Sequence, residues 1–245
     1  MFNNADNVEN HLRANGHRIW GFVVYRCTYS SDRDWESCIE RIQEDVRSGM
    51  DMYNGHDLLQ EGCFQLTVIS DAGTLDGAST QAVRRDFNAW CGRMVHEEQG
   101  SPEEIERRKQ KTPLWFDDWL LPVRYNYCIQ IDEDSMRSIL SSEEDRPWVK
   151  IIKADWKPRE MEPTQFVPGQ GWVMEIRGRY KDVEYDKFHT EEDDEEYPPI
   201  EGCTDEDVGW VKMWYLSLMP GIYTDFICPY NWETVYVRPP GISDG

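Results

Sequence analysis

The chain has little positive charge for its length. Its 245 residues include 26 Lys and Arg against 47 Asp and Glu, which gives a formal net charge of −21. Nucleic acids and anionic membranes attract clusters of Lys and Arg, so both repel a strongly acidic chain. The charge therefore argues against nucleic acid and against a membrane as direct partners.

Long apolar runs, paired cysteines and the common catalytic motifs are also missing. No stretch approaches the roughly 18 apolar residues of a membrane span, and the amino terminus lacks the basic start and apolar stretch of a secretory signal. Seven cysteines stand singly, without a Cys-x-x-Cys pair, which argues against a disulfide framework and a zinc ribbon. Neither a Gly-x-Ser-x-Gly segment nor a glycine-rich phosphate loop occurs. We therefore predict a cytoplasmic or nuclear protein with no cofactor and no metal, and whether it is an enzyme stays open.

Aromatic residues are plentiful. Eleven Trp, twelve Tyr and eight Phe are present, and each aromatic side chain buries roughly 150–250 Å². We predict a single domain over residues 19–230, preceded by a polar leader (1–18) and followed by a tail (231–245). Trp232 and Tyr236 indicate that the tail docks on the domain.

Apolar periodicity indicates alternating strands and helices. Trp35, Cys38, Ile42 and Val46 recur on one helical face, whereas residues 21–25 are typical of a buried strand. The predicted strands are 19–28, 63–69, 124–131, 148–156, 171–180 and 208–215, and the predicted helices are 31–49, 79–94, 101–112, 132–140 and 220–226. Because the last strands follow one another without helices, the pattern favours antiparallel pairing. We therefore predict an α+β fold whose mainly antiparallel sheet carries helices on one face, in a ferredoxin-like arrangement.

Much of the negative charge lies in one predicted insertion, residues 182–207. This segment contains thirteen Asp and Glu and one Lys, a local balance of −12. Clustered carboxylates suit hard divalent cations, and His189 precedes the acidic run 191–196. The spacing differs from that of a calcium loop, however, and contiguous acids cannot all turn toward one ion. We therefore interpret the segment as a solvated loop between two strands.

Five residues are candidates for ligand binding: Tyr25, Arg26, Asp76, Arg84 and Tyr125. Arg26 lies on an otherwise apolar strand, where its charge needs either a bound anion, in a pocket with Tyr25 or Tyr125, or a structural ion pair. Asp76 and Arg84 flank the start of a predicted helix, which is either a ligand site or ordinary turn and N-cap chemistry. In both cases the structural explanation is the commoner one.

Several short blocks resemble a family of uncharacterised filamentous-fungal proteins. The blocks are Trp-Gly-Phe-Val-Val-Tyr-Arg at 20–26 with Asp-Trp at 34–35, Leu-Asp-Gly-Ala-Ser at 75–79 leading to Val-Arg at 83–84 and Phe-x-x-Trp at 87–90, Arg-Tyr-x-x-Cys at 124–128, the stretch 132–140, and Gly-Trp-Val-Lys at 209–212. The likeness spans roughly residues 19 to 226. It implies a fungal, intracellular protein of this same architecture, and it transfers no catalytic role.

Two functions fit these features. The first is a non-enzymatic protein that binds a basic protein partner through loop aromatics and the acidic segment. The alternative is a cofactor-less enzyme for a small molecule (an isomerase, cyclase or hydrolase) with an aromatic pocket near Arg26. We predict the first, because no catalytic spacing occurs in the chain.

Overall fold

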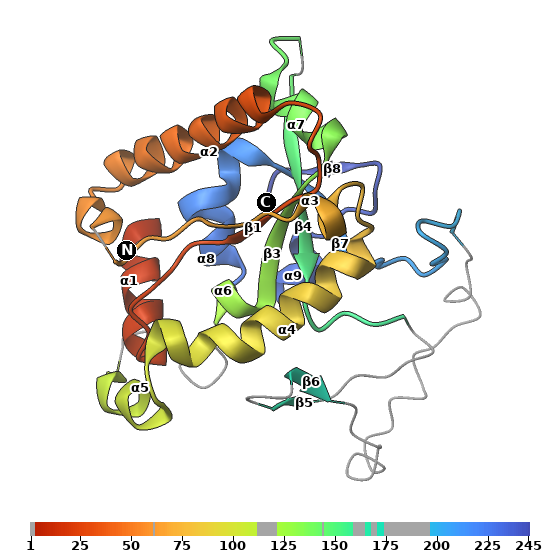
Figure 1. Cartoon of the computed structure of the whole chain (residues 1–245). Helices are drawn as coiled ribbons and strands as arrows, with labels where there is room; N and C mark the ends of the chain where they lie inside the picture. Colours follow the sequence, from red (N-terminus) through yellow and green to blue (C-terminus); the bar gives the residue numbers. More distant parts are fainter. Residues whose placement is uncertain are drawn as a thin grey trace.

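A mixed six-stranded β-sheet forms the centre of the protein (Figure 1). The computed structural model describes residues 3–60, 62–111, 122–143, 145–158, 165–167, 171–173 and 197–245. The strand order is β2-β1-β3-β4-β7-β8, and β5 and β6 form a separate antiparallel pair. The strands are β1 (Val23–Arg26), β2 (Thr67–Ile69), β3 (Tyr127–Ile131), β4 (Trp148–Lys153), β5 (Gln165–Val167), β6 (Gly171–Val173), β7 (Trp210–Trp214) and β8 (Ile242–Ser243).

All strands of the main sheet run in the same direction except β4. β1 pairs in parallel with β2 and β3, and β7 pairs in parallel with β8, whereas β4 is antiparallel to both of its neighbours. The prediction of a mainly antiparallel, ferredoxin-like α+β fold is therefore wrong, and the protein is an α/β protein. The physical reason is that helical crossovers follow β1 and β2, and a crossover returns the chain to the starting end of the sheet as a parallel neighbour.

Helices cover both faces of this sheet, and not one face as predicted. Figure 1 shows α2 and α4 on opposite sides of it. Phe22 and Val24 pack on the α2 side, and Val23 and Tyr25 pack on the α4 side, so β1 is apolar on both faces. The helical elements are α1 (Asn4–Asn15), α2 (Asp32–Met52), η1 (His56–Leu59), α3 (Ala72–Leu75), α4 (Thr80–Gln99), α5 (Pro102–Arg108), α6 (Val123–Asn126), α7 (Glu133–Leu140), η5 (Tyr215–Ser217), η6 (Leu218–Ile222), α8 (Tyr223–Asp225) and α9 (Asn231–Val235).

The predicted helices from 31, 79, 101 and 132 are confirmed as α2, α4, α5 and α7. Each begins at a polar N-cap, namely Ser31, Ser79, Ser101 or Asp132, whose side chain accepts a hydrogen bond from a backbone N–H of the first turn. The predicted strand 124–131 begins later, at Tyr127, because the preceding residues form the helical turn α6.

Both ends of the described chain pack against the core. In α1, which falls in the predicted leader, Ala5, Val8 and Leu12 are buried in the α2-side core. In the predicted tail, Trp232 is 2% exposed and its ring stacks on that of Tyr127 with centroids 5.8 Å apart. The apolar interior therefore includes residues on both sides of the predicted domain limits.

Much of the acidic insertion lies outside the described residues. Residues 182–196, with His189 and the run 191–196, belong to that part, and the predicted strand 171–180 is described only as β6. The chain is described again from 197, where Ile200 and Cys203 form a β-bridge. Within the described ranges, no helix combines the length and the apolar character that a membrane span needs.

A buried ion pair joins the beginnings of three strands. Arg124 is 1% exposed, and its Nε and Nη2 donate to the two carboxylate oxygens of Glu98 on α4, each at 2.7 Å. Its other N–H groups donate to the carbonyl oxygens of Gly21 (2.8 Å) and Gln65 (2.9 Å) and to the hydroxyl of Thr67 (2.6 Å). One guanidinium therefore connects α4 with the chain that leads into β1, with β2, and with the turn before β3.

A buried histidine makes stability depend on pH. His11 on α1 is 1% exposed, and its ring meets that of Tyr223 edge-on. Burial, with a smaller effect of the charge of His17, lowers the pKa of His11 to about 3. An unfolded chain restores a pKa of about 6.5. Below that pH the unfolded state therefore binds the extra proton, and the folded state loses stability as the pH falls toward the folded pKa.

We expect the His11→Phe variant to lose part of this pH dependence. From pH 7 to pH 5, the neutral His11 should lower the free energy of unfolding by about 2 kcal/mol. Urea unfolding of both proteins at the two pH values measures the difference. If the wild type and the variant lose the same free energy between pH 7 and pH 5, the assignment to His11 is wrong.

Candidate functional site

A crevice opens where β1 and β3 end. The two strands are parallel neighbours, so their carboxyl ends meet at the same edge of the sheet. The chain after β1 continues through α2 to β2 on one side, and the chain after β3 continues through α7 to β4 on the other. In open α/β sheets, ligands bind in the crevice at such a point of divergence. The topology therefore marks this place as the first candidate for a site.

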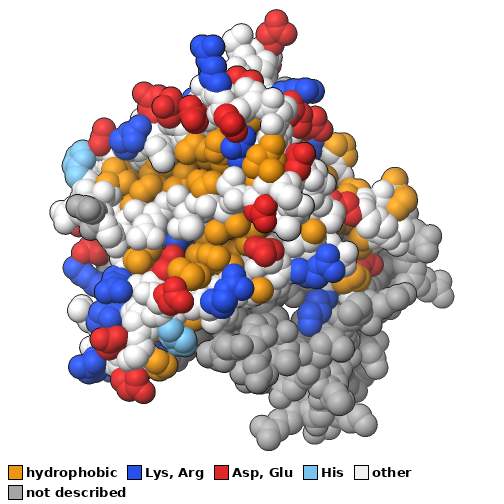
Figure 2. Space-filling model, in the orientation of Figure 1, with side chains coloured by type: hydrophobic (Ala, Val, Ile, Leu, Met, Phe, Trp, Pro, Cys, Tyr) orange, Lys and Arg blue, Asp and Glu red, His pale blue; other side chains and the backbone are white. Residues whose placement is uncertain are grey.

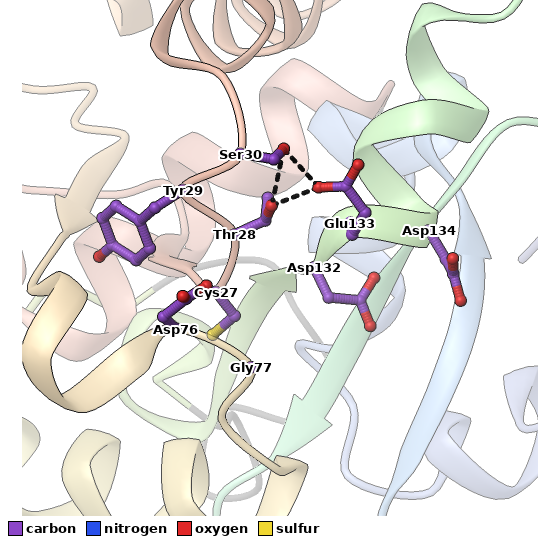
Figure 3. A pocket seen from close by; sticks show the side chains of 9 residues that line it. All are labelled: Cys27, Thr28, Tyr29, Ser30, Asp76, Gly77, Asp132, Glu133 and Asp134. Atoms are coloured by element: carbon purple, nitrogen blue, oxygen red, sulfur yellow. Dashed lines mark hydrogen bonds between the residues drawn. The ribbon is translucent and has the colours of Figure 1, made fainter.

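Three loops line this crevice, which has a volume of about 420 Å³. They are residues 27–30 after β1, residues 76–77 after α3, and residues 132–134 at the start of α7. Figure 3 shows Asp76 on one side of the crevice and Asp132 on the other. Backbone hydrogen bonds fix this arrangement, since Cys27 N–H donates to Ile131 O (2.8 Å) and Gly77 N–H donates to Cys27 O (3.1 Å).

Two hydroxyl groups converge on one carboxylate in the crevice. Oε2 of Glu133 accepts hydrogen bonds from Thr28 Oγ1 (2.5 Å) and Ser30 Oγ (2.6 Å), the contacts drawn in Figure 3. Its Oε1 pairs with Nη2 of Arg137 at 2.7 Å. The hydrogen bonds from Ser30 and Thr28, together with the charge of Arg137, lower the pKa of Glu133. Glu133 is therefore ionised at neutral pH.

The remaining acids of the crevice divide into one paired and two unpaired carboxylates. Asp132 accepts from the backbone N–H of Ser135 (3.0 Å) and pairs with Nζ of Lys150 on β4 (2.7 Å). Burial acts against its charge, but Lys150 and Ser135 outweigh burial and lower the pKa of Asp132. Asp76 and Asp134 make no ion pair with any other described residue. The crevice therefore carries uncompensated negative charge.

The thiol beside these acids is not an activated nucleophile. Cys27 is 2% exposed, and burial raises its pKa to about 12. The reactive form of cysteine is the thiolate, so Cys27 stays an unreactive thiol at neutral pH. Across the described ranges, no group of three or more His, Cys, Asp or Glu side chains is placed to hold a metal ion. The described groups of the crevice offer negative charge and hydrogen bonds.

Two of the five predicted site residues, Tyr25 and Arg26, point to opposite faces of β1. The hydroxyl of Tyr25 donates to Asp86 on α4 at 2.7 Å. Arg26 is 8% exposed, pairs with Asp32 at 2.5 Å and lies over two aromatic rings. The two side chains therefore share no pocket, and Arg26 has the partners of a structural ion pair.

Tyr125 and Arg84 also lie away from the crevice. The hydroxyl of Tyr125 donates to Glu98 (2.8 Å) within the buried network of Arg124. Arg84 donates from Nε and Nη2 to the carbonyl oxygens of Lys153 (2.9 Å) and Gly209 (2.8 Å), and it lines a second cavity of about 310 Å³. Of the five predicted residues, the structure places Asp76 alone in the crevice.

Sequence reasoning missed Thr28, Ser30 and Glu133. All three follow the carboxyl end of a strand within a few residues. A position just after a strand points to a ligand site only when the two strands are known to be parallel neighbours. The antiparallel prediction removed this signal, because it placed the ends of successive strands at opposite edges of the sheet.

Comparison of the chain with protein-family models, with curated proteins and with solved structures found no match. The resemblance to a filamentous-fungal family therefore stays a prediction. Function has to be inferred from the position, the charge and the hydrogen bonds of the crevice itself.

Removing one hydroxyl donor should change the titration of Glu133. Thr28→Val keeps the branched shape of the side chain and removes the hydrogen bond to Glu133. We expect the pKa of Glu133 to rise toward its ordinary value, because fewer donors then stabilise the carboxylate. Carbon-detected NMR titration of the side-chain carboxyl groups measures this rise. Thr234→Val on α9 is the control, and equal titration of Glu133 in both variants would contradict the assignment.

Proposed function

We propose that the crevice binds a cationic group, an ammonium or a guanidinium, presented either by a small molecule or by the surface of a basic protein. The observation that supports this most is the pair of unpaired carboxylates, Asp76 and Asp134, in a crevice where the connections after two parallel strands diverge. A cation that reaches either carboxylate gains a charge-assisted hydrogen bond that none of the described residues makes.

The other groups of the crevice fit the same ligand. Glu133 and Asp132 have lowered pKa values, so both are ionised at neutral pH. Each is paired, with Arg137 and Lys150, but a carboxylate has further lone pairs that can accept hydrogen bonds from a bound cation. The volume of about 420 Å³ lies within the range of small-ligand pockets, roughly 300–1,000 Å³.

Binding is better supported than catalysis. Cys27 stays protonated at neutral pH, and Glu133 and Asp132 stay ionised, so none of the three is poised to exchange a proton there. The alternative of a cofactor-less enzyme with a pocket near Arg26 gains no support, because Arg26 is already paired with Asp32. We therefore keep the predicted binding role and assign it to this crevice.

Charge-removing variants test the proposal. Asp76→Asn and Asp134→Asn should each weaken the binding of spermidine or of an oligolysine peptide by about 1.5- to 5-fold, because an exposed ion pair contributes roughly 0.2–1 kcal/mol. Isothermal titration calorimetry measures the affinity, which should also fall as salt is added. Spermidine binding indicates a small-molecule ligand, and binding of the peptide alone indicates a protein partner.

The control is Glu97→Gln, which removes the same charge from an exposed position on α4, outside the crevice. We expect it to leave the affinity unchanged. If Glu97→Gln weakens binding as much as the crevice variants do, the cation is held by net charge alone and the proposal fails. Absence of binding by both cations would also reject it.

A further inference from the structure

The outer edge of β2 presents free backbone hydrogen-bonding groups. β2 is the first strand of the sheet, and β1 is its neighbour on the inner side. The N–H groups of Gln65 and Thr67 donate to the carbonyl oxygens of Trp20 and Phe22, the residues that lead into β1. In a parallel strand these groups alternate in direction, so the N–H and C=O of Leu66 and Val68 point outward. No other described residue bonds to them.

Apart from its shortness, three residues, this edge lacks the features that usually protect an edge strand. Natural proteins place charged side chains, proline or a covering loop at such positions, because an open edge pairs with other strands. Residues 62–70 contain neither a charged residue nor a proline, although 30% of the chain is charged. Val68 is one of the few large hydrophobic side chains that are exposed, at 38%.

Apolar side chains lie on both sides of the edge. Figure 2 shows two hydrophobic bands on this face, one between α2 and the edge of the sheet and the other between that edge and α4. Near this edge, Phe64 and Leu66 are partly buried against the α2-side core, and Ile69 is partly buried against the α4-side core. An added strand would therefore gain apolar contacts as well as backbone hydrogen bonds.

We infer that the occupant of this edge is a second copy of the chain, paired antiparallel through β2 about a two-fold axis at Thr67. In this register, Leu66 of each copy exchanges both backbone hydrogen bonds with Val68 of the other. Side chains two residues apart lie on the same side of a strand, so Leu66 of one copy also meets Val68 of the other across the axis. The edge is thus complementary to itself, as a closed two-fold interface requires.

The net charge opposes a second copy, and it opposes it least along this uncharged strip. Two chains of net charge −21 repel each other, and they approach at least cost along a strip that carries no charge. The remaining repulsion acts over longer distances and is screened by salt, since the Debye length falls from about 10 Å at 0.1 M to about 3 Å at 1 M. Added salt should therefore strengthen this dimer, whereas it should weaken cation binding in the crevice. The two proposals are independent and separable by this test.

Sedimentation velocity over a range of protein and salt concentrations tests the inference. As protein concentration rises, the mass of the wild type should increase from 29.0 kDa to twice that value. With added salt, this shift should occur at a lower protein concentration than without it. Val68→Lys should raise the dissociation constant at least about tenfold. Val68→Pro should do the same, because proline removes the outward N–H and leaves the hydrogen bonds to β1 in place.

The matched control is Val237→Lys, which adds the same charge at a valine that is 40% exposed and lies after α9. It should dimerise like the wild type, and circular dichroism confirms that each variant is folded. A wild type that stays monomeric at all concentrations overturns the inference, as does equal dimerisation of Val68→Lys and Val237→Lys. A monomer that binds an extended apolar peptide at β2 would assign the edge to a foreign strand instead.

Discussion

The ion pair between Arg124 and Glu98 holds the beginnings of the first three strands in place. Its guanidinium uses all of its N–H groups, on Glu98, on two carbonyl oxygens and on Thr67. A buried charge that lost this partner would cost about 3–5 kcal/mol. Because a strand that is fixed at one end has a fixed register, the same contact determines where the other ends of β1 and β3 lie.

The two ends of the sheet therefore have different roles. At the amino ends, charge is buried and fully hydrogen-bonded, which orders the strands. At the carboxyl ends, Thr28 and Ser30 stabilise the ionised Glu133, and Asp76 and Asp134 form no ion pair with another described residue. The strand order also leaves β2 at the margin of the sheet. The proposed cation site and the proposed dimer edge both follow from this one arrangement.

Local features of the fold could be predicted from the sequence, and long-range ones could not. The helices from Ser31 and Asp132 were predictable, because a polar cap and an apolar stripe lie within one segment. The direction of β4 and the adjacency of β1 and β3 depend on pairing between segments distant in the chain. Asp76 was a candidate from its loop alone, whereas Glu133 becomes one only after β1 and β3 are placed side by side.

Amide hydrogen exchange of the Glu98→Gln variant tests the role of the ion pair most directly. This change keeps the shape of the side chain and removes the charge that compensates Arg124. We expect the amides of β1, β2 and β3 to lose protection together, by roughly two to three orders of magnitude. If only the end of α4 loses protection while the three strands keep theirs, the ion pair does not order the sheet, and the account of the crevice and the edge loses its basis.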